Sequence, residues 1–452
     1  MNTTTVPRRT PRWRIVAAVC VAAFLTMCLA ISAGGASTTA AAPALPTAVT
    51  LVGHGNGHGI GMGQWGAYGY AVDAGWSAWQ IVDHYYGGTV HGTAPLDSTV
   101  TVRLQGLDGA QTAVVSDADI GAAGSGWRSL VVRRSGASYT VWARTDAKVC
   151  PSPSDQLGAP WAQVASGTGT FDVATPTPAV TTDTTQLLWT CRPDGTLRAY
   201  RGSLQSVSDS SGVAHTVNVV PVEQYLRAVV AKEMSPSWAN AGGGRGLQAL
   251  AAQAIAGRSY ALSEHLYSYA TTCDSVCQTY QGAATRSGVG STIVAVEHPL
   301  SDPAVSMTAG MVLLTQAGAP AHTMYAASTG GYTDVNAQLM FPAVPDDGDA
   351  TALNPNHDWT VTLSAAQIQA AYPSIGTFAG LTVLARNGLG DLGGRVTSIR
   401  VEGTAGSTTV TGDAFRSALG LRSNWFAVSG EPLTTVSGSA TAAAVARRIP
   451  RS

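Results

Sequence analysis

Apolar and polar residues alternate most clearly in the second quarter of the chain. From Ser98 to about Val220, short alternating runs such as Thr99-Val-Thr-Val-Arg and Tyr139-Thr-Val-Trp are separated by turn residues. A period of two is typical of strands that bury one face. The pattern therefore predicts a β-rich region at residues 96–220.

The pattern then changes to helical spacing. A helix with Pro221 at its first position has the apolar stripe Leu226, Val229 and Val230, and Glu233 falls on that same stripe. A carboxylate in a hydrophobic position is either paired, at a cost, or kept for chemistry. Partial burial favours the protonated form that a general acid needs near pH 7. The alternative is an exposed glutamate at the end of an amphipathic helix, which this feature alone favours.

A second helix is expected to start near Gly246. Arg258 and His265 are seven residues apart on its stripe, so they should point the same way. Shorter helical segments are expected at 66–86 and 414–419, and mixed strands and loops elsewhere. These regions predict an α+β fold, with β-rich lobes around a two-helix segment. The second helix should bury Leu247, Leu250, Ala251, Ala254, Ala261 and Leu262.

The first 42 residues have the pattern of a secretory signal peptide. Four arginines (Arg8, Arg9, Arg12 and Arg14) precede an apolar run, and small residues follow it. An uncleaved membrane anchor is the alternative, although the run of 17 residues at 15–31 is short for a membrane span. We expect export to the cell wall or the medium, with no stable membrane span after cleavage.

Removal of this segment changes the formal net charge from −1 to about −5. A net negative chain is a poor partner for nucleic acid or for an anionic membrane surface. Four cysteines remain, and an even number in an exported protein indicates disulfides, most simply Cys150–Cys191 and Cys273–Cys277. The sequence leaves this connectivity open.

The densest motif is the glycine-rich segment Gly53-His-Gly-Asn-Gly-His-Gly-Ile-Gly-Met-Gly-Gln-Trp-Gly-Ala. Alternate glycines let a backbone pass close to a ligand or to another segment. His54 and His58 are candidate metal ligands, but such a loop fixes no coordination geometry. A phosphate-binding loop is excluded because no lysine follows.

Eight segments between about residues 51 and 428 together resemble the SpoIID/LytB family of peptidoglycan-acting proteins. The family's GHG-x-GM-x-QWGA block usually comes last, whereas here it comes first, at 53–67, as in a circular permutation. Permutation requires neighbouring ends, so the linker at 43–50 and the segment near Ser429 should be adjacent. The segments are YRGSLQSV, VNVVPVEQYLRAVVAKEMSPSW, LQALAAQAIAGRSYAL, CDSVCQTYQG, AASTGGYT, FPAVPDDGDATALNPNHDWTVTLS, GRVTSIRVEGTAGSTTVTGDAFRSALGLRSNWFAV and GHGIGMGQWGAYGYAVDAGWSAWQIVDHYYGGT.

The resemblance implies a lytic transglycosylase that acts on peptidoglycan glycan strands, with Glu233 as its single acid/base. Glu233 would protonate the oxygen that leaves N-acetylmuramic acid. It would then accept a proton from the attacking C6 hydroxyl, giving a 1,6-anhydro product. Hydrolytic glycosidases normally need two carboxylates, and Glu223 lies about three turns away. No cofactor is required for this reaction.

The resemblance also implies a saccharide groove. Arg258 would orient Glu233 or bind sugar, or alternatively form a buried structural ion pair. Some relatives hold structural zinc with two cysteines and a histidine, here Cys273, Cys277 and His265. The alternative, which the C-x3-C spacing and an oxidising compartment favour, is a disulfide or free thiols. The groove residues that the resemblance implies are Gln253, Arg258, Gln278, Tyr280, Ser328, Gly330, Gly331, His58 and Gln64.

Two other functions remain open. Members of the family also act as modifiers of a cell-wall amidase, so this chain is alternatively a non-catalytic binder of glycan or of that partner enzyme. A zinc amidase using His54 or His58 lacks a convincing set of further ligands. The predicted organisation is a signal peptide (1–42), a linker (43–50), the GHG segment (51–95), the β-rich region (96–220), the SpoIID-like catalytic region (221–428) and a disordered tail (429–452).

Overall fold

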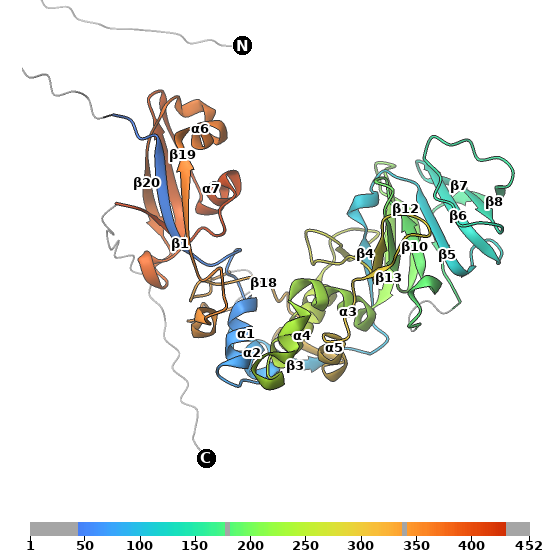
Figure 1. Cartoon of the computed structure of the whole chain (residues 1–452), viewed down its shortest axis with the longest axis horizontal. Helices are drawn as coiled ribbons and strands as arrows, with labels where there is room; N and C mark the ends of the chain where they lie inside the picture. Colours follow the sequence, from blue (N-terminus) through green and yellow to red (C-terminus); the bar gives the residue numbers. More distant parts are fainter. Residues whose placement is uncertain (1–43, 177–180, 337–340, 431–452) are drawn as a thin grey trace, which may run out of the picture. The chain divides into compact units, whose positions relative to one another are not determined.

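The computed structural model describes residues 44–176, 181–336 and 341–430 (Figure 1). The predicted signal peptide and nearly all of the predicted tail lie outside these ranges. The described residues form both helices and several sheets, so the predicted α+β class is confirmed. Among the described helices, none is long and apolar enough to cross a membrane.

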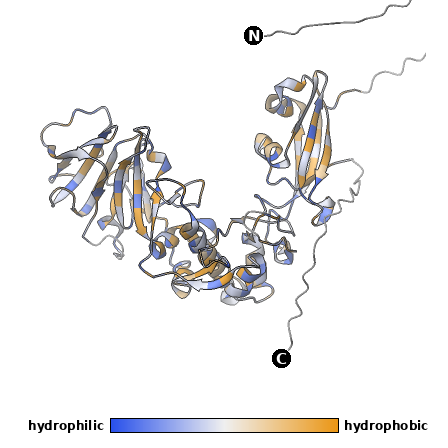
Figure 2. Ribbon diagram, turned by 180° about the vertical axis from the view of Figure 1, so that it is seen from behind, coloured by the Kyte–Doolittle hydropathy of each residue, from blue (hydrophilic) through white to orange (hydrophobic). Residues whose placement is uncertain are grey.

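The predicted β-rich region is built from two sheets in which most neighbouring strands are antiparallel. Figure 2 shows hydrophobic and hydrophilic positions mixed along their strands. The larger sheet has the order β16 (Val294–Ala295), β15 (Ala284–Arg286), β11 (Leu197–Tyr200), β10 (Leu188–Cys191), β5 (Thr112–Ile120), β6 (Trp127–Ser135), β7 (Ser138–Arg144) and β8 (Ala162–Thr168). The smaller sheet has the order β14 (Thr272–Cys273), β4 (Thr99–Arg103), β13 (Ala214–Pro221), β12 (Ser203–Ser208) and β9 (Phe171–Val173).

The remaining strands form small sheets. Two of them have three strands, in the orders β19 (Asp358–Ser364), β1 (Ala48–His54), β23 (Phe426–Val428) and β20 (Phe378–Arg386), β21 (Val396–Gly403), β22 (Gly406–Val410). Two are pairs, β17 (Met311–Leu314) with β3 (Val90–Thr93), and β18 (Tyr325–Ala326) with β2 (Met62–Gly63).

Helix α4 (Leu247–Ser263) is the centre of the helical region and packs against four other helices (Figure 1). It begins after Gly246, as predicted, but it ends before His265. His265 is therefore exposed while Arg258 is buried, so the prediction that they share one face is wrong. The helices are α1 (Gln64–Val72), α2 (Ala78–Tyr85), α3 (Val222–Glu233), α4, α5 (Asp302–Met307), α6 (Ala365–Ala371) and α7 (Gly412–Leu419).

A buried ion pair joins α3 to α4. Arg258, with no exposed surface, donates to both carboxylate oxygens of Glu223, Nε to Oε1 at 2.8 Å and Nη2 to Oε2 at 2.7 Å. It also donates from Nη1 to the carbonyl of Met311 at 2.9 Å. Nε and both terminal nitrogens of the guanidinium thus have acceptors inside the protein. Arg258 thus forms a structural ion pair with Glu223. The expectation that it orients Glu233 or binds a sugar is wrong.

Strand β1 joins the first described residues to the last ones. It lies between β19 and β23, pairing Leu51 with Val428 and Gly53 with Phe426. The amide of Ser429 donates to the carbonyl of Thr50 at 2.9 Å. The expected proximity of these two segments is therefore confirmed. Residues 48–50 of the expected linker belong to this strand, because they pair with residues 362–364 of β19.

The Asp346–Asp349 turn is a buried hub of hydrogen bonds. Both carboxylates have no exposed surface. Asp346 accepts from the hydroxyls of Tyr85 (2.8 Å) and Thr329 (2.6 Å). Asp349 accepts from the backbone amides of Thr329 and Gly330. A Cβ at Gly66 would lie 2.3 Å from Asp346, so only glycine lets α1 approach this carboxylate.

The titration of Asp346 should be visible in the stability of the fold. Burial, and then the negative charge of Asp349, raise the pKa of Asp346 to about 7. The folded state then binds the proton more tightly than the unfolded state, whose carboxyl titrates near pH 4. The stabilisation is complete below about pH 4 and is lost as the pH rises toward 7.

We therefore expect Asp346→Asn to flatten the dependence of the unfolding free energy on pH between about 4 and 7, where the wild-type slope approaches about 1.4 kcal/mol per pH unit from this group. Denaturant unfolding at a series of pH values measures it. Asp347→Asn, on the exposed neighbour, is the control and should keep the wild-type slope. Equal slopes for wild type and Asp346→Asn would contradict the assignment.

Replacing Arg258 by methionine should strongly destabilise the protein, because the Glu223 carboxylate, 17% exposed, loses its counter-charge. The expected loss of unfolding free energy is about 3–5 kcal/mol. Arg245→Met, which removes an exposed arginine just before α4, should change it by less than about 0.5 kcal/mol. Adding Glu223→Gln to Arg258→Met should recover part of the loss; no recovery would mean that the pair is not the cause.

Candidate functional site

Glu233 is the last residue of α3 and is partly exposed. Its two carboxylate oxygens have different partners. Oε1 accepts a short hydrogen bond of 2.6 Å from the backbone amide of Thr279. Oε2 accepts a long one of 3.4 Å from Nε2 of Gln64. One oxygen is therefore held firmly by the backbone, and the other has a single weak partner.

Gln64 comes from the GHG segment and is the first residue of α1. Strand β2, immediately before it, pairs with β18, and this pairing fixes where α1 begins. Nε2 of Gln64 also donates to Oε1 of Gln253 on α4, at 3.3 Å. Both glutamines are buried, at 8% and 0% exposure. Of the residues that the sequence assigned to the groove, the structure thus brings Gln64 and Gln253 to Glu233.

A layer of tyrosines and one glutamine lies beside this carboxylate. Gln278 accepts from the hydroxyl of Tyr225 and donates to the hydroxyl of Tyr325, both at 2.9 Å. Burial, and then the charge of Glu233, raise the pKa of Tyr325 well above its usual range. This phenol remains protonated near the carboxylate. Gln278 therefore holds two tyrosines through its buried amide, and its place in the groove stays a prediction.

Several expected groove residues have structural roles. Tyr280 is 1% exposed and donates to Oδ1 of Asn218 at 2.7 Å, so it belongs to the core. The expectation that it lines the groove is wrong, because its hydroxyl has a partner inside the protein. His58 accepts from the amide of Ile60 within its own loop, at 2.9 Å. Burial, and then the charge of Arg395, lower the pKa of His58 to about 4, so this imidazole is neutral at pH 7.

The S-x-GG block belongs to the aspartate hub. Ser328 is fully buried and donates to Asp349 at 2.9 Å, and Gly330 donates its amide to the same carboxylate at 2.9 Å. The amide of Gly331 donates to the hydroxyl of Thr329 at 3.3 Å. These three residues therefore hold the turn that supports α1. Ser328 and Gly330 are buried, so the expectation that they contact sugar is wrong, whereas for the partly exposed Gly331 it stays a prediction.

Two tryptophans near Glu233 were missed by the sequence reasoning. Trp65 follows Gln64 directly, and Trp238 lies five residues after Glu233. Their ring centroids are 4.6 Å apart and both rings are partly exposed, while Tyr68 packs against Trp238 at 4.8 Å. Partly exposed aromatic rings beside a polar site suit the apolar faces of sugars. Their positions next to Gln64 and soon after Glu233 were the available signal.

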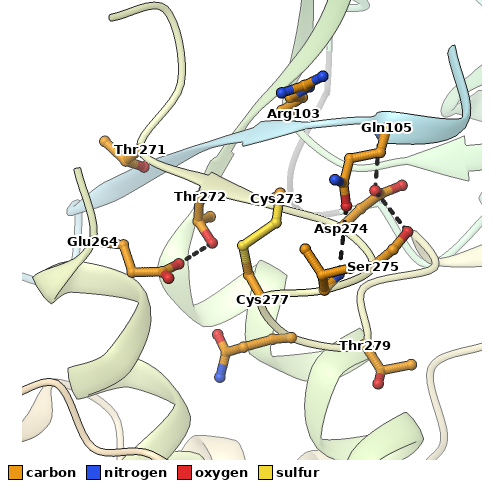
Figure 3. Close-up of a disulfide and its surroundings, with 12 residues drawn as sticks. Arg103, Gln105, Glu264, Thr271, Thr272, Cys273, Asp274, Ser275, Cys277 and Thr279 are labelled. Carbon is orange, nitrogen blue, oxygen red and sulfur yellow. Dashed lines mark hydrogen bonds between the residues drawn. A yellow bond between two sulfur atoms is a disulfide. The ribbon is translucent and has the colours of Figure 1, made fainter. Parts of the chain in front are cut away.

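A disulfide closes the loop that leads to Thr279 (Figure 3). Cys273 and Cys277 are bonded, and Cys150 is bonded to Cys191, as the simplest pairing predicted. Asp274 accepts from the amide of Gln105 at 3.0 Å, which ties the same loop to the sheet. The disulfide fixes the approach of the Thr279 amide to Glu233.

The disulfide also argues against a zinc site at these cysteines. Disulfide sulfurs are not thiolate ligands, and His265 is exposed beyond the end of α4. Within the described ranges, no group of three histidine, cysteine or acidic residues is placed to hold a metal ion. The expectation of zinc at His265, Cys273 and Cys277 therefore does not fit these residues.

Two nearby glutamates are engaged elsewhere. Glu223 is bound by Arg258, as described above. Glu264 is 4% exposed and accepts from the hydroxyl of Thr272 (Figure 3). Burial raises the pKa of Glu264. Glu233 thus differs from both, because it combines partial exposure with a long, weak contact at one oxygen.

Comparison with known proteins agrees with this site. Neither a curated protein nor a solved structure matches the chain. Residues 210–314 match the model of the family described as SpoIID, stage II sporulation protein. The matched range contains α3 with Glu233, the whole of α4, and the loop with Thr279. This segment of the chain is therefore similar to the SpoIID family.

Proposed function

We propose that this protein is an exported lytic transglycosylase that cleaves the glycan strands of peptidoglycan. The observation that carries the proposal is the state of Glu233. Its carboxyl group is partly exposed, one oxygen is fixed by the Thr279 amide, and the other keeps only a 3.4 Å contact. Such a group can transfer a proton to a bound substrate without first losing a strong hydrogen bond.

In the proposed reaction, protonated Glu233 gives its proton to the oxygen between N-acetylmuramic acid and N-acetylglucosamine. The bond from C1 of the muramic acid to that oxygen breaks. The C6 hydroxyl of the same sugar attacks C1, and the Glu233 carboxylate takes up the hydroxyl proton. The products are a 1,6-anhydromuramic end and a free 4-hydroxyl, and no water is consumed. A single carboxylate suffices, which agrees with the engagement of Glu223 by Arg258.

The pairing of β1 with β23 supports the proposed circular permutation. The GHG segment is placed early in the chain, yet it supplies Gln64 to the site. The proposed location is the cell wall or the medium, from the signal-like residues 1–42, and the proposed partner is the glycan strand itself. The reaction as written requires no cofactor. A non-catalytic modifier of a cell-wall amidase is the alternative.

The proposal is tested with residues 43–452 and their Glu233→Gln variant, each incubated with intact and with amidase-stripped peptidoglycan. Mass spectrometry of the soluble products should show wild-type fragments lighter than hydrolysis products by one water. The variant should lose at least about 100-fold of this activity, because the amide cannot transfer the proton.

The alternatives give other products. Fragments of the full hydrolysis mass would indicate a glycosidase that uses water, and free stem peptides would indicate an amidase. Glycan binding by both proteins with no soluble product would contradict the enzymatic function and favour a non-catalytic glycan-binding protein. Using both substrates also shows whether stem peptides must first be removed.

A further inference from the structure

The two glutamines next to Glu233 have a hydrogen-bond arrangement with one unusual feature. Nε2 of Gln64 donates to Glu233 and to Gln253, so both of its hydrogens have acceptors. Gln253 has no exposed surface and turns its oxygen toward Gln64. Its own Nε2 is buried with no hydrogen-bond partner among the described residues.

This arrangement has a cost. An unpaired buried donor is unfavourable, and rotating the Gln253 amide by 180° would move that donor to the side of Gln64. The rotation would place Nε2 of Gln253 against Nε2 of Gln64, so that two donors would face each other. To avoid this contact, the amide of Gln64 would have to rotate as well. Its oxygen would then face either Gln253 or the carboxylate of Glu233. The unpaired donor of Gln253 is thus the consequence of presenting an acceptor to Gln64.

We infer that Gln253 is a positioning residue that acts on Glu233 through Gln64. The inference rests on the proposed transglycosylase function. Gln253 holds the amide of Gln64 with Nε2 toward the carboxylate. Gln64 then sets the rotation of the Glu233 carboxyl group, whose Oε1 is already fixed by the Thr279 amide.

The two oxygens of Glu233 therefore have different tasks. Oε1, with its 2.6 Å bond from the backbone, is the anchored oxygen. Oε2, with only the 3.4 Å contact from Gln64, is the oxygen that releases the proton and takes it up again. Gln64 and Gln253 come from α1 and α4, so the aim of Oε2 depends on how the GHG segment docks on the helical pair.

The inference is tested by a double-mutant cycle on the release of anhydro products. The variants are Gln64→Met, Gln253→Met and the double variant, because methionine keeps the unbranched shape and removes the amide. We expect Gln64→Met to lower kcat by about 100-fold with KM nearly unchanged, since misplacing a catalytic group by about 1 Å costs this much. Gln253→Met should lower kcat in the wild-type background and have no further effect beside Gln64→Met.

Gln369→Met is the matched control. Gln369 is on α6, outside both the GHG segment and the helical pair, and its side chain accepts from the amide of Phe378 at 2.9 Å. This variant should keep the wild-type kcat. Melting temperatures of all variants check that they fold, and Gln253→Leu, of similar volume, replaces Gln253→Met if that variant does not fold.

Two results would overturn the inference while the proposed function stands. One is a wild-type kcat for Gln253→Met; the other is multiplication of the two single effects in the double variant, which means that Gln253 acts independently of Gln64. A fall in kcat that accompanies a proportional rise in KM would assign both glutamines to substrate binding instead. If the wild type itself releases no anhydro product, it is the proposed function that fails.

Discussion

The contact between the Glu233 carboxylate and two N–H donors is the interaction on which the site depends. The donors come from segments far apart in the chain, the Thr279 amide and the Gln64 side chain. Each donor needs its own support. The Cys273–Cys277 disulfide closes the loop before Thr279, and the pairing of β2 with β18 places Gln64 at the start of α1. The site therefore exists only when the helical pair, this loop and the GHG segment are docked together.

Buried charge provides that docking. The pair of Arg258 with Glu223 joins α3 to α4, and the Asp346–Asp349 hub receives donors from α2 and from the segment after β18. Arg395, 1% exposed, donates to the carbonyl of Thr329 at 2.7 Å, and burial lowers its pKa to about 10. Buried ionic groups are expensive and add little net stability, so their contribution here is to fix one arrangement of the segments.

Much of the framework could be predicted from sequence because periodicity reports which face is buried. The two helices, the strands of the β-rich region and the placement of Glu233 follow from such patterns. The adjacency of β1 and β23 followed from the displaced motif order. The binding partner of the Arg258 side chain could not be predicted, because spacing does not say whether a polar residue on an apolar stripe contacts another side chain or a substrate. The helix ends two residues before His265, and this small difference in length removed one expected ligand.

Other features leave no trace in the residue types. The Thr279 donor is a backbone amide, which every residue except proline carries. Tyr280 and Ser328 belong to recognisable motifs, yet their hydroxyls are satisfied inside the protein. Motif membership therefore identified segments near the site correctly and assigned individual side chains less well.

A crystal structure of the Glu233→Gln variant with a bound oligosaccharide containing N-acetylmuramic acid would show whether residue 233 reaches the glycosidic bond. We expect a glycosidic oxygen within about 2.6–3.2 Å of the side-chain nitrogen that replaces Oε2, with the side-chain oxygen still accepting from the Thr279 amide. A glycan bound elsewhere, or one whose glycosidic oxygens all lie beyond the reach of residue 233, would contradict it.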